Sequence, residues 1–284
     1  MRSIRVLGLG LGCALTLGAT LCGDATAIES NLKMLPEVGR CVRVEGGKAE
    51  FRSVKCARSE PGVGPYAWLS GPGPKRKFTA KTGTIKLQSA GNVITCPGGT
   101  GEGEYTGPKN LKLTTLVLEG CQQSAKGGIE SFCQNELGSK NGQIAFKEVE
   151  GELGFISHPR KLKVGWDLKP VSGANLAALE CGGASSTLEK SVGTGIKREV
   201  QGSVVGKVFP LGTASFEYTV IYQVAKRGAQ YPERFEGGVR DTLTALVEAK
   251  AGEKTPEATV LLGELDLVDE EALEVLGKCV GRGC

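Results

Sequence analysis

The chain has 284 residues, is 40% hydrophobic and 23% charged, and carries a formal net charge of +4. The near balance of 35 Lys and Arg against 31 Asp and Glu gives no strong positive field, so we predict no nucleic-acid partner. After residue 27 no apolar run approaches the roughly 20 residues needed to cross a bilayer, and we predict no membrane span in the mature chain.

The first residues have the pattern of an export signal. Arg2 and Arg5 precede the apolar stretch 6–15, and Ala25-Thr26-Ala27 matches the small-x-small sequence that a signal peptidase cleaves. This pattern predicts a signal peptide over residues 1–27 and a mature protein that is secreted or located in the cell envelope. In such an oxidising environment cysteines pair as disulfides instead of remaining free thiols.

Apolar and polar residues alternate with a period of two along the rest of the chain, which predicts strands. The clearest run is 216–224, in which Phe216, Tyr218, Val220, Tyr222 and Val224 share one face. Further strands are expected over 84–88, 111–118, 162–168, 243–247 and 259–262. The 43 glycines have no fixed period and are typical of turns between strands.

Residues 41–45 and 48–55 flank Gly46-Gly47 and are expected to form a hairpin. Residues 128–137 could form two turns of helix, and 269–276 either a helix end or a last strand. The whole pattern predicts about a dozen strands in an all-β, antiparallel, disulfide-stapled β-sandwich or jelly-roll-like fold. Residues 28–284 are expected to form one large all-β domain or two packed β subdomains.

Eight cysteines follow the signal, and we interpret them as four disulfides. Eight cysteines allow 105 pairings, so the connectivity is a hypothesis. The hairpin favours Cys41–Cys56, and the short polar loop between Cys121 and Cys133 favours a bond between those two. Cys96 and Cys181 have similar positions at strand ends and are expected to pair, which leaves Cys279–Cys284. No C-x-x-C pair and no second histidine occur, so we predict no zinc site and no cofactor.

No arrangement typical of catalysis is visible in the sequence. His158, the one histidine, lies in a turn before a strand, and no G-x-S-x-G occurs. Residues 99–104 are glycine-rich but lack the lysine and helix of a phosphate loop, which favours a flexible connection between strands. Lys75-Arg76-Lys77 could contact an acidic envelope polymer or simply form a solvated loop.

Glu148, Glu150 and Glu152 alternate and would lie on one side of a strand, about 6.8 Å apart. Such a row of carboxylates could bind calcium. It could also face water beside lysines on adjacent strands, and the sequence favours this second interpretation.

Paired carboxylates could hydrolyse glycosidic bonds if the fold holds them about 5–10 Å apart. The candidate pairs are Glu236 with Asp241 and Glu102 with Glu104. Sugar sites also use exposed aromatic residues, which are scarce at 5% of this chain. The two tryptophans, Trp68 and Trp166, lie in strand-like runs where burial is expected.

Several short sequence segments occur in a familiar order, namely residues 36–41, 71–74, 78–79, 104–109, 151–154, 167–170, 235–238 and 270–274. This order resembles a family of uncharacterised secreted proteins from soil actinobacteria, over roughly residues 36–275. No activity, ligand or catalytic residue comes with that family. Residues 185–198 and the tail after Leu276, with Cys279 and Cys284, lie outside the pattern.

We therefore expect a secreted, disulfide-stabilised protein with a non-catalytic structural or binding role at the cell envelope, its ligand an envelope polymer or a protein. The alternative is a polysaccharide-active hydrolase that uses paired carboxylates. The calcium-binding face at Glu148 is a third hypothesis.

Overall fold

The period-two alternation of the sequence produces strands throughout the described chain. The computed structural model describes residues 35–56, 59–89, 92–124, 130–135, 141–156, 163–182, 195–226, 228–250 and 252–276. These residues form 21 strands, all paired antiparallel, and no helix. The all-β prediction is confirmed, although the number of strands exceeds the expected dozen. No described segment has the length and hydropathy of a membrane-spanning helix.

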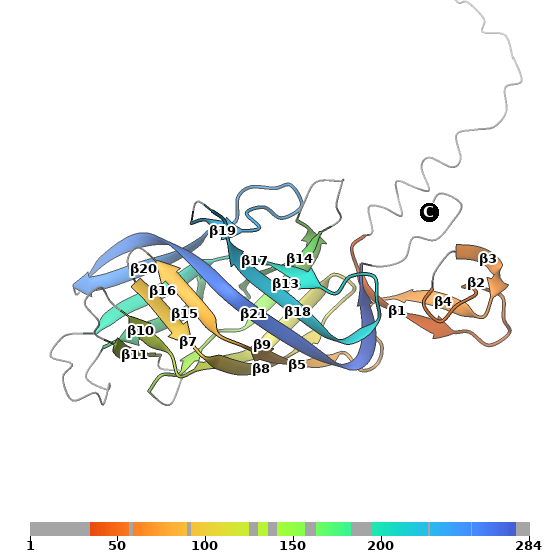
Figure 1. The fold of residues 1–284 in the computed structure, drawn as a ribbon, viewed down its shortest axis with the longest axis horizontal. Coiled ribbons are helices and arrows are strands. Elements are labelled where there is room, and N and C mark those ends of the chain that lie inside the picture. The colour runs from red at the N-terminus through yellow and green to blue at the C-terminus, as the bar shows by residue number, and fades with distance from the viewer. Residues whose placement is uncertain are drawn as a thin grey trace, which may run out of the picture.

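Most of the strands join end to end into eight long antiparallel strands that wind up and down around a closed barrel (Figure 1). In chain order the long strands are β5 (Lys77–Thr82) with β6 (Ile85–Ser89); β7 (Asn92–Cys96) with β8 (Gly98–Tyr105); β9 (Asn110–Glu119) with β10 (Gln122–Ser124); β11 (Glu130–Gln134) with β12 (Ile144–Ala145) and β13 (Val149–Phe155); β14 (Val164–Pro170) with β15 (Asn175–Cys181); β16 (Ile196–Gly202) with β17 (Val204–Phe209); β18 (Ser215–Val224) with β20 (Leu243–Lys250); and β21 (Glu253–Val275). The short β19 (Gln230–Tyr231) pairs with the end of β18.

Strand β21 closes the barrel. It is 23 residues long, and Leu265 pairs with Val220 of β18 on one side and with Thr82 of β5 on the other. The predicted sandwich or jelly roll is therefore corrected to a closed barrel. Both architectures need the same alternation along each strand, and what distinguishes them is the pairing of the first and last long strands, which are far apart in the sequence.

A small N-terminal sheet extends from one end of the barrel (Figure 1). It consists of β1 (Val38–Arg43), β2 (Ala49–Phe51), β3 (Ser59–Gly64) and β4 (Tyr66–Ser70). Strand β1 is joined to the barrel because Val38 pairs with Val275 of β21. The predicted hairpin of residues 41–55 is wrong in its pairing. Although Gly46 and Gly47 do form a turn, β4 pairs with both β1 and β2 and separates them.

Two other local predictions need correction. The possible helix at 128–137 is strand β11 over residues 130–134, because its backbone pairs with β10 and β15. The glycine-rich run 99–104 is not a connection but part of strand β8. A Cβ on Gly103 would lie 2.4 Å from the Phe78 ring, so glycine is required where the inner face of β8 meets the core. The remaining ambiguous segment, 269–276, continues strand β21 to Val275.

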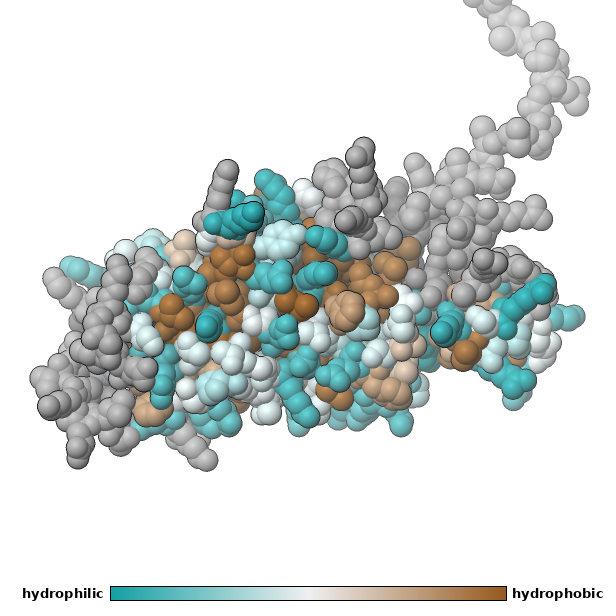
Figure 2. All heavy atoms as spheres, viewed as in Figure 1, coloured by the Kyte–Doolittle hydropathy of each residue, from teal (hydrophilic) through white to brown (hydrophobic). Residues whose placement is uncertain are grey.

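The barrel interior is filled differently at its two ends. Near the N-terminal sheet it contains Phe78, Tyr105 and Trp166, whose rings are in contact at centroid distances of 5.2 and 6.3 Å. Towards the other end aliphatic side chains line the interior, as described below. On the outside, Figure 2 shows apolar patches that polar residues interrupt across the visible face.

Candidate functional site

Two adjoining cavities lie inside the barrel. Each has a volume of about 40 Å³, and aliphatic residues with one phenylalanine and one cysteine line the first throughout. They share six lining residues: Ile85, Leu118, Phe146, Leu176, Val204 and Leu261. Thr82 and Tyr222 are the polar residues in the lining of the second cavity. A space with so little polar lining offers water few hydrogen bonds, so a cavity of this kind stays dry and accepts apolar molecules.

Arg198 lies beside this apolar space. On β16 the exposed Lys197 and the half-buried Glu199 flank it, so Arg198 shares the inner face of the strand with Val200, which lines the first cavity. Its cross-strand neighbour on β15 is Leu179, another cavity residue. Arg198 is 2% exposed, and none of its three guanidinium nitrogens has a hydrogen-bond partner in the described structure.

Glu257 is the acidic residue whose charge interacts with the Arg198 guanidinium. It lies on β21 opposite the buried Ala245, and its Oε2 is buried without a hydrogen-bond partner among the described residues. Burial lowers the pKa of Arg198, and the charge of Glu257 opposes this shift. A guanidinium is almost never fully buried unless it is paired. This part of the barrel thus has a cation, an anion and apolar space, and both charged groups retain unused hydrogen-bonding capacity.

The aromatic end of the barrel contains a different buried polar group. The Tyr105 hydroxyl donates a hydrogen bond to Oδ1 of Asp269 at 3.1 Å, and Oδ2 of Asp269 is buried without a described partner. Burial raises the pKa of Asp269 to about 8, while the Tyr105 hydrogen bond opposes the shift. The carboxyl is therefore largely protonated at neutral pH and adds little charge to the core.

A carboxylate cluster lies outside the barrel, beneath the segment that joins β19 to β20. Ser203 donates a hydrogen bond to Oδ1 of Asp241 at 2.5 Å, and Asp167 lies close enough for the charge of Asp241 to affect it. Burial, followed by Asp241, raises the pKa of Asp167 to about 6. Two neighbouring carboxyl groups, of which Asp167 has a raised pKa, could act as an acid and a base.

The glutamate row pairs with lysines on neighbouring strands. Lys112 Nζ lies 2.9 Å from Glu148, and Lys169 Nζ lies 3.7 Å from Glu150. The third carboxylate, Glu152, is opposite Asp167 on β14. Glu148 and Glu150 thus lie beside lysines of adjacent strands, as the second interpretation expected, whereas Glu152 lies beside a carboxylate.

The carboxylates of the two predicted pairs, Glu236 with Asp241 and Glu102 with Glu104, lie in different parts of the fold. Oε1 of Glu236 accepts a hydrogen bond of 2.8 Å from the Phe155 amide and so fastens its loop to β13. Asp241 belongs to the cluster with Asp167 described above. Glu102 and Glu104 alternate on β8, each beside a residue of β9.

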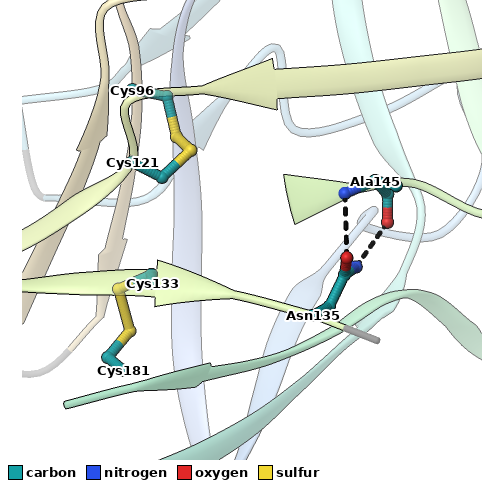
Figure 3. Close-up of a disulfide and its surroundings, with 6 residues drawn as sticks. All are labelled: Cys96, Cys121, Cys133, Asn135, Ala145 and Cys181. Atoms are coloured by element: carbon teal, nitrogen blue, oxygen red, sulfur yellow. Dashed lines mark hydrogen bonds between the residues drawn. A yellow bond between two sulfur atoms is a disulfide. The ribbon is translucent and has the colours of Figure 1, made fainter. Parts of the chain in front are cut away.

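The disulfides are partly as predicted. Cys41–Cys56 forms, although β1 and β2 do not pair directly. The other two bonds among the described residues are Cys96–Cys121 and Cys133–Cys181, which corrects the predicted Cys121–Cys133 and Cys96–Cys181 (Figure 3). Each of these two bonds joins neighbouring segments of the barrel wall, with a Cα–Cα distance of 4.1 Å. Three disulfides are typical of a protein that folds in an oxidising compartment.

The remaining predicted features are distributed as follows. The basic residues 75–77 are exposed at the start of β5. Trp166 is buried in the core at 1% exposure, and Trp68 is half-buried, its indole donating to Oε1 of Glu37 at 2.6 Å. The predicted signal 1–27, His158, Cys279 and Cys284 lie outside the described residues.

Arg198 and Glu257 were missed in the sequence, although a signal exists for each. In Ile196-Lys197-Arg198-Glu199-Val200 the alternation places Arg198 on the face of two apolar residues. Glu257 likewise alternates with Thr259 and Leu261. A charged residue at an inward position of an alternating strand indicates a buried charge.

Comparison of this chain with models of protein families, with curated proteins and with solved structures finds no match.

Proposed function

We propose that this protein is an exported, disulfide-stabilised binding protein that acts without catalysis at the cell envelope and takes a small apolar ligand into its barrel. The observation that carries the proposal is the pair of adjoining apolar cavities inside the closed barrel. The export pattern, the three disulfides and the resemblance to secreted actinobacterial proteins support the location.

Xenon tests the cavity directly, because it enters dry apolar cavities. Xenon NMR of the purified protein is expected to show a bound resonance. Ala177→Leu should remove this resonance, because Ala177 is 1% exposed and lines the first cavity. Val200→Ile, a smaller change in the same lining, should weaken it.

The matched control is Ala258→Leu, the same substitution at an exposed position of β21, which should leave xenon binding unchanged. Circular dichroism establishes that each variant is folded. A folded wild-type protein without a bound xenon resonance would end the proposal.

A carboxylate-dependent polysaccharide hydrolase is the second candidate, and the raised pKa of Asp167 beside Asp241 favours it. Incubation with envelope polysaccharides separates the two functions. Turnover by the wild-type protein that Asp167→Asn abolishes would establish the hydrolase, whereas the binding protein releases no product.

A further inference from the structure

We propose that the ligand of the barrel is a linear carboxylic acid, whose carboxylate binds Arg198 and whose alkyl chain occupies the apolar cavities. This inference rests on the proposed binding function, since it names the chemical class of the ligand for the same interior.

The position of Arg198 supplies the head-group site. Its side chain lies on the inner face of β16, in line with Val200 and beside Leu179, and both of these residues line the first cavity. All three guanidinium nitrogens are buried and have no described hydrogen-bond partner. Arg198 is not itself part of the cavity lining, so the proposed ligand extends from the cavity past Val200 and Leu179 to reach these unused donors.

The chemistry of the guanidinium selects the head group. Its N–H groups form a planar fork that matches the two oxygens of a carboxylate, and such charge-assisted bonds are stronger than neutral ones. Glu257 balances the charge of Arg198 in the free protein without forming a hydrogen bond to it. A carboxylate would supply the hydrogen bonds, whereas an ammonium head would be repelled by Arg198.

The rest of the interior selects the tail. The two cavities adjoin and share aliphatic lining, so the part of the ligand beyond its head must be apolar and slender. At the aromatic end, Phe78, Tyr105 and Trp166 fill the barrel. The ligand therefore has one polar end, located at Arg198.

Isothermal titration with three probes of equal chain length, octanoate, octanol and octylamine, tests the inference. We expect octanoate to bind the wild-type protein at least tenfold more tightly than octanol, and octylamine not to bind. Arg198→Met should weaken octanoate binding at least tenfold, whereas Ala258→Leu, at an exposed position of β21, should leave octanoate binding unchanged. Arg198→Lys, which keeps the charge but lacks the fork, should give an intermediate loss.

Two further variants sharpen the result. Glu257→Gln removes the competing carboxylate and should tighten octanoate binding several-fold. Ala177→Leu should abolish octanoate binding, because it fills the first cavity. Arg198→Met leaves the buried Glu257 carboxylate without its counter-charge, which destabilises the fold. The double variant Arg198→Met/Glu257→Gln removes both charges and provides a folded test of the same loss of octanoate binding.

The outcomes separate the two proposals. If xenon binds but octanoate binds Arg198→Met as tightly as the wild type, the inference is overturned and the apolar binding function stands. Octanoate that binds Ala177→Leu as tightly as the wild type would not occupy the first cavity, which also overturns the inference. If neither xenon nor octanoate binds the folded wild-type protein, both proposals fail.

Discussion

Cys121 and Cys133 are cross-strand neighbours whose sulfurs do not bond to each other. The Cys133 amide donates a 2.9 Å hydrogen bond to the Cys121 carbonyl, yet Cys121 is bonded to Cys96 and Cys133 to Cys181. The four cysteines thus form one row across β7, β10, β11 and β15. A Cys121–Cys133 bond would leave the outer two about 14 Å apart, three strand spacings, so they could not pair.

This row predicts the result of a thiol-mapping experiment. In Cys121→Ala/Cys133→Ala, alkylation of the unfolded, unreduced protein should label both Cys96 and Cys181. If these two remained unlabelled because they were cross-linked, the observed pairing would be refuted. Cys96→Ala/Cys121→Ala should label neither Cys133 nor Cys181. By opening the 25-residue span between its cysteines, it should also lower the free energy of unfolding by about 3 kcal/mol in denaturant titrations.

Asp269 should make the protein less stable as the pH rises. Its pKa is raised from 3.8 to about 8 in the folded state, so between these values the folded protein holds a proton that the unfolded chain has lost. Stability therefore falls as the pH rises through this window. Asp269→Asn stays neutral and can still accept the Tyr105 hydrogen bond, so its melting temperature should vary less across this range.

Calorimetry at several pH values measures the effect of Asp269. Glu270→Gln, at the exposed neighbouring position, is the matched control and should keep the wild-type pH dependence. A slope for Asp269→Asn as steep as that of the wild type would show that another group is responsible.

Gly103 should not tolerate a side chain. Its Cβ would lie 2.4 Å from the Phe78 ring and 2.5 Å from the Lys112 carbonyl, and overpacking of this kind costs about 1–3 kcal/mol. Gly103→Ala should lower the free energy of unfolding by this amount in urea titrations. Gly83→Ala, where nothing lies within 4 Å of the new Cβ, should be neutral or slightly stabilising. Equal effects at the two positions would contradict the packing argument.

The side chain of Asn135 forms the two hydrogen bonds to Ala145 that the backbone of a paired strand would otherwise form in the barrel wall. Between β11 and β12, the side-chain amide of Asn135 accepts a hydrogen bond from the Ala145 N–H at 3.1 Å and donates one to the Ala145 carbonyl at 2.6 Å (Figure 3). Asn135→Ala leaves both backbone groups without these partners and should cost about 1–3 kcal/mol in thermal or chemical unfolding.

Gln143→Ala is the matched control for Asn135. Its amide makes an exposed hydrogen bond to Glu119, and the substitution should change stability by less than about 0.5 kcal/mol. If the two variants were equally stable, the side-chain bridge would not contribute to the wall.

Local pattern in the sequence determined the clearest strands and, for most of their residues, which face is buried. The run 216–224 became β18 with Tyr218, Val220 and Tyr222 inside, although Phe216, predicted on the same face, is 59% exposed. Trp166 took the inward position that its alternation predicted. These results follow from a period of two within a single strand, and this requires no knowledge of its partners. The same alternation in residues 196–200 places Arg198 on the inward face, although this position was not predicted.

Only the tertiary structure decided which strands pair. Backbone hydrogen bonds are alike for any two strands, so the pairing of β5 with β21, which closes the barrel, has no local signal in the sequence. The same holds for the cysteine row, because each sulfur bonds to the neighbour that the strand register supplies. Packing of the whole interior selects that register, and it also places Arg198 beside the apolar cavity.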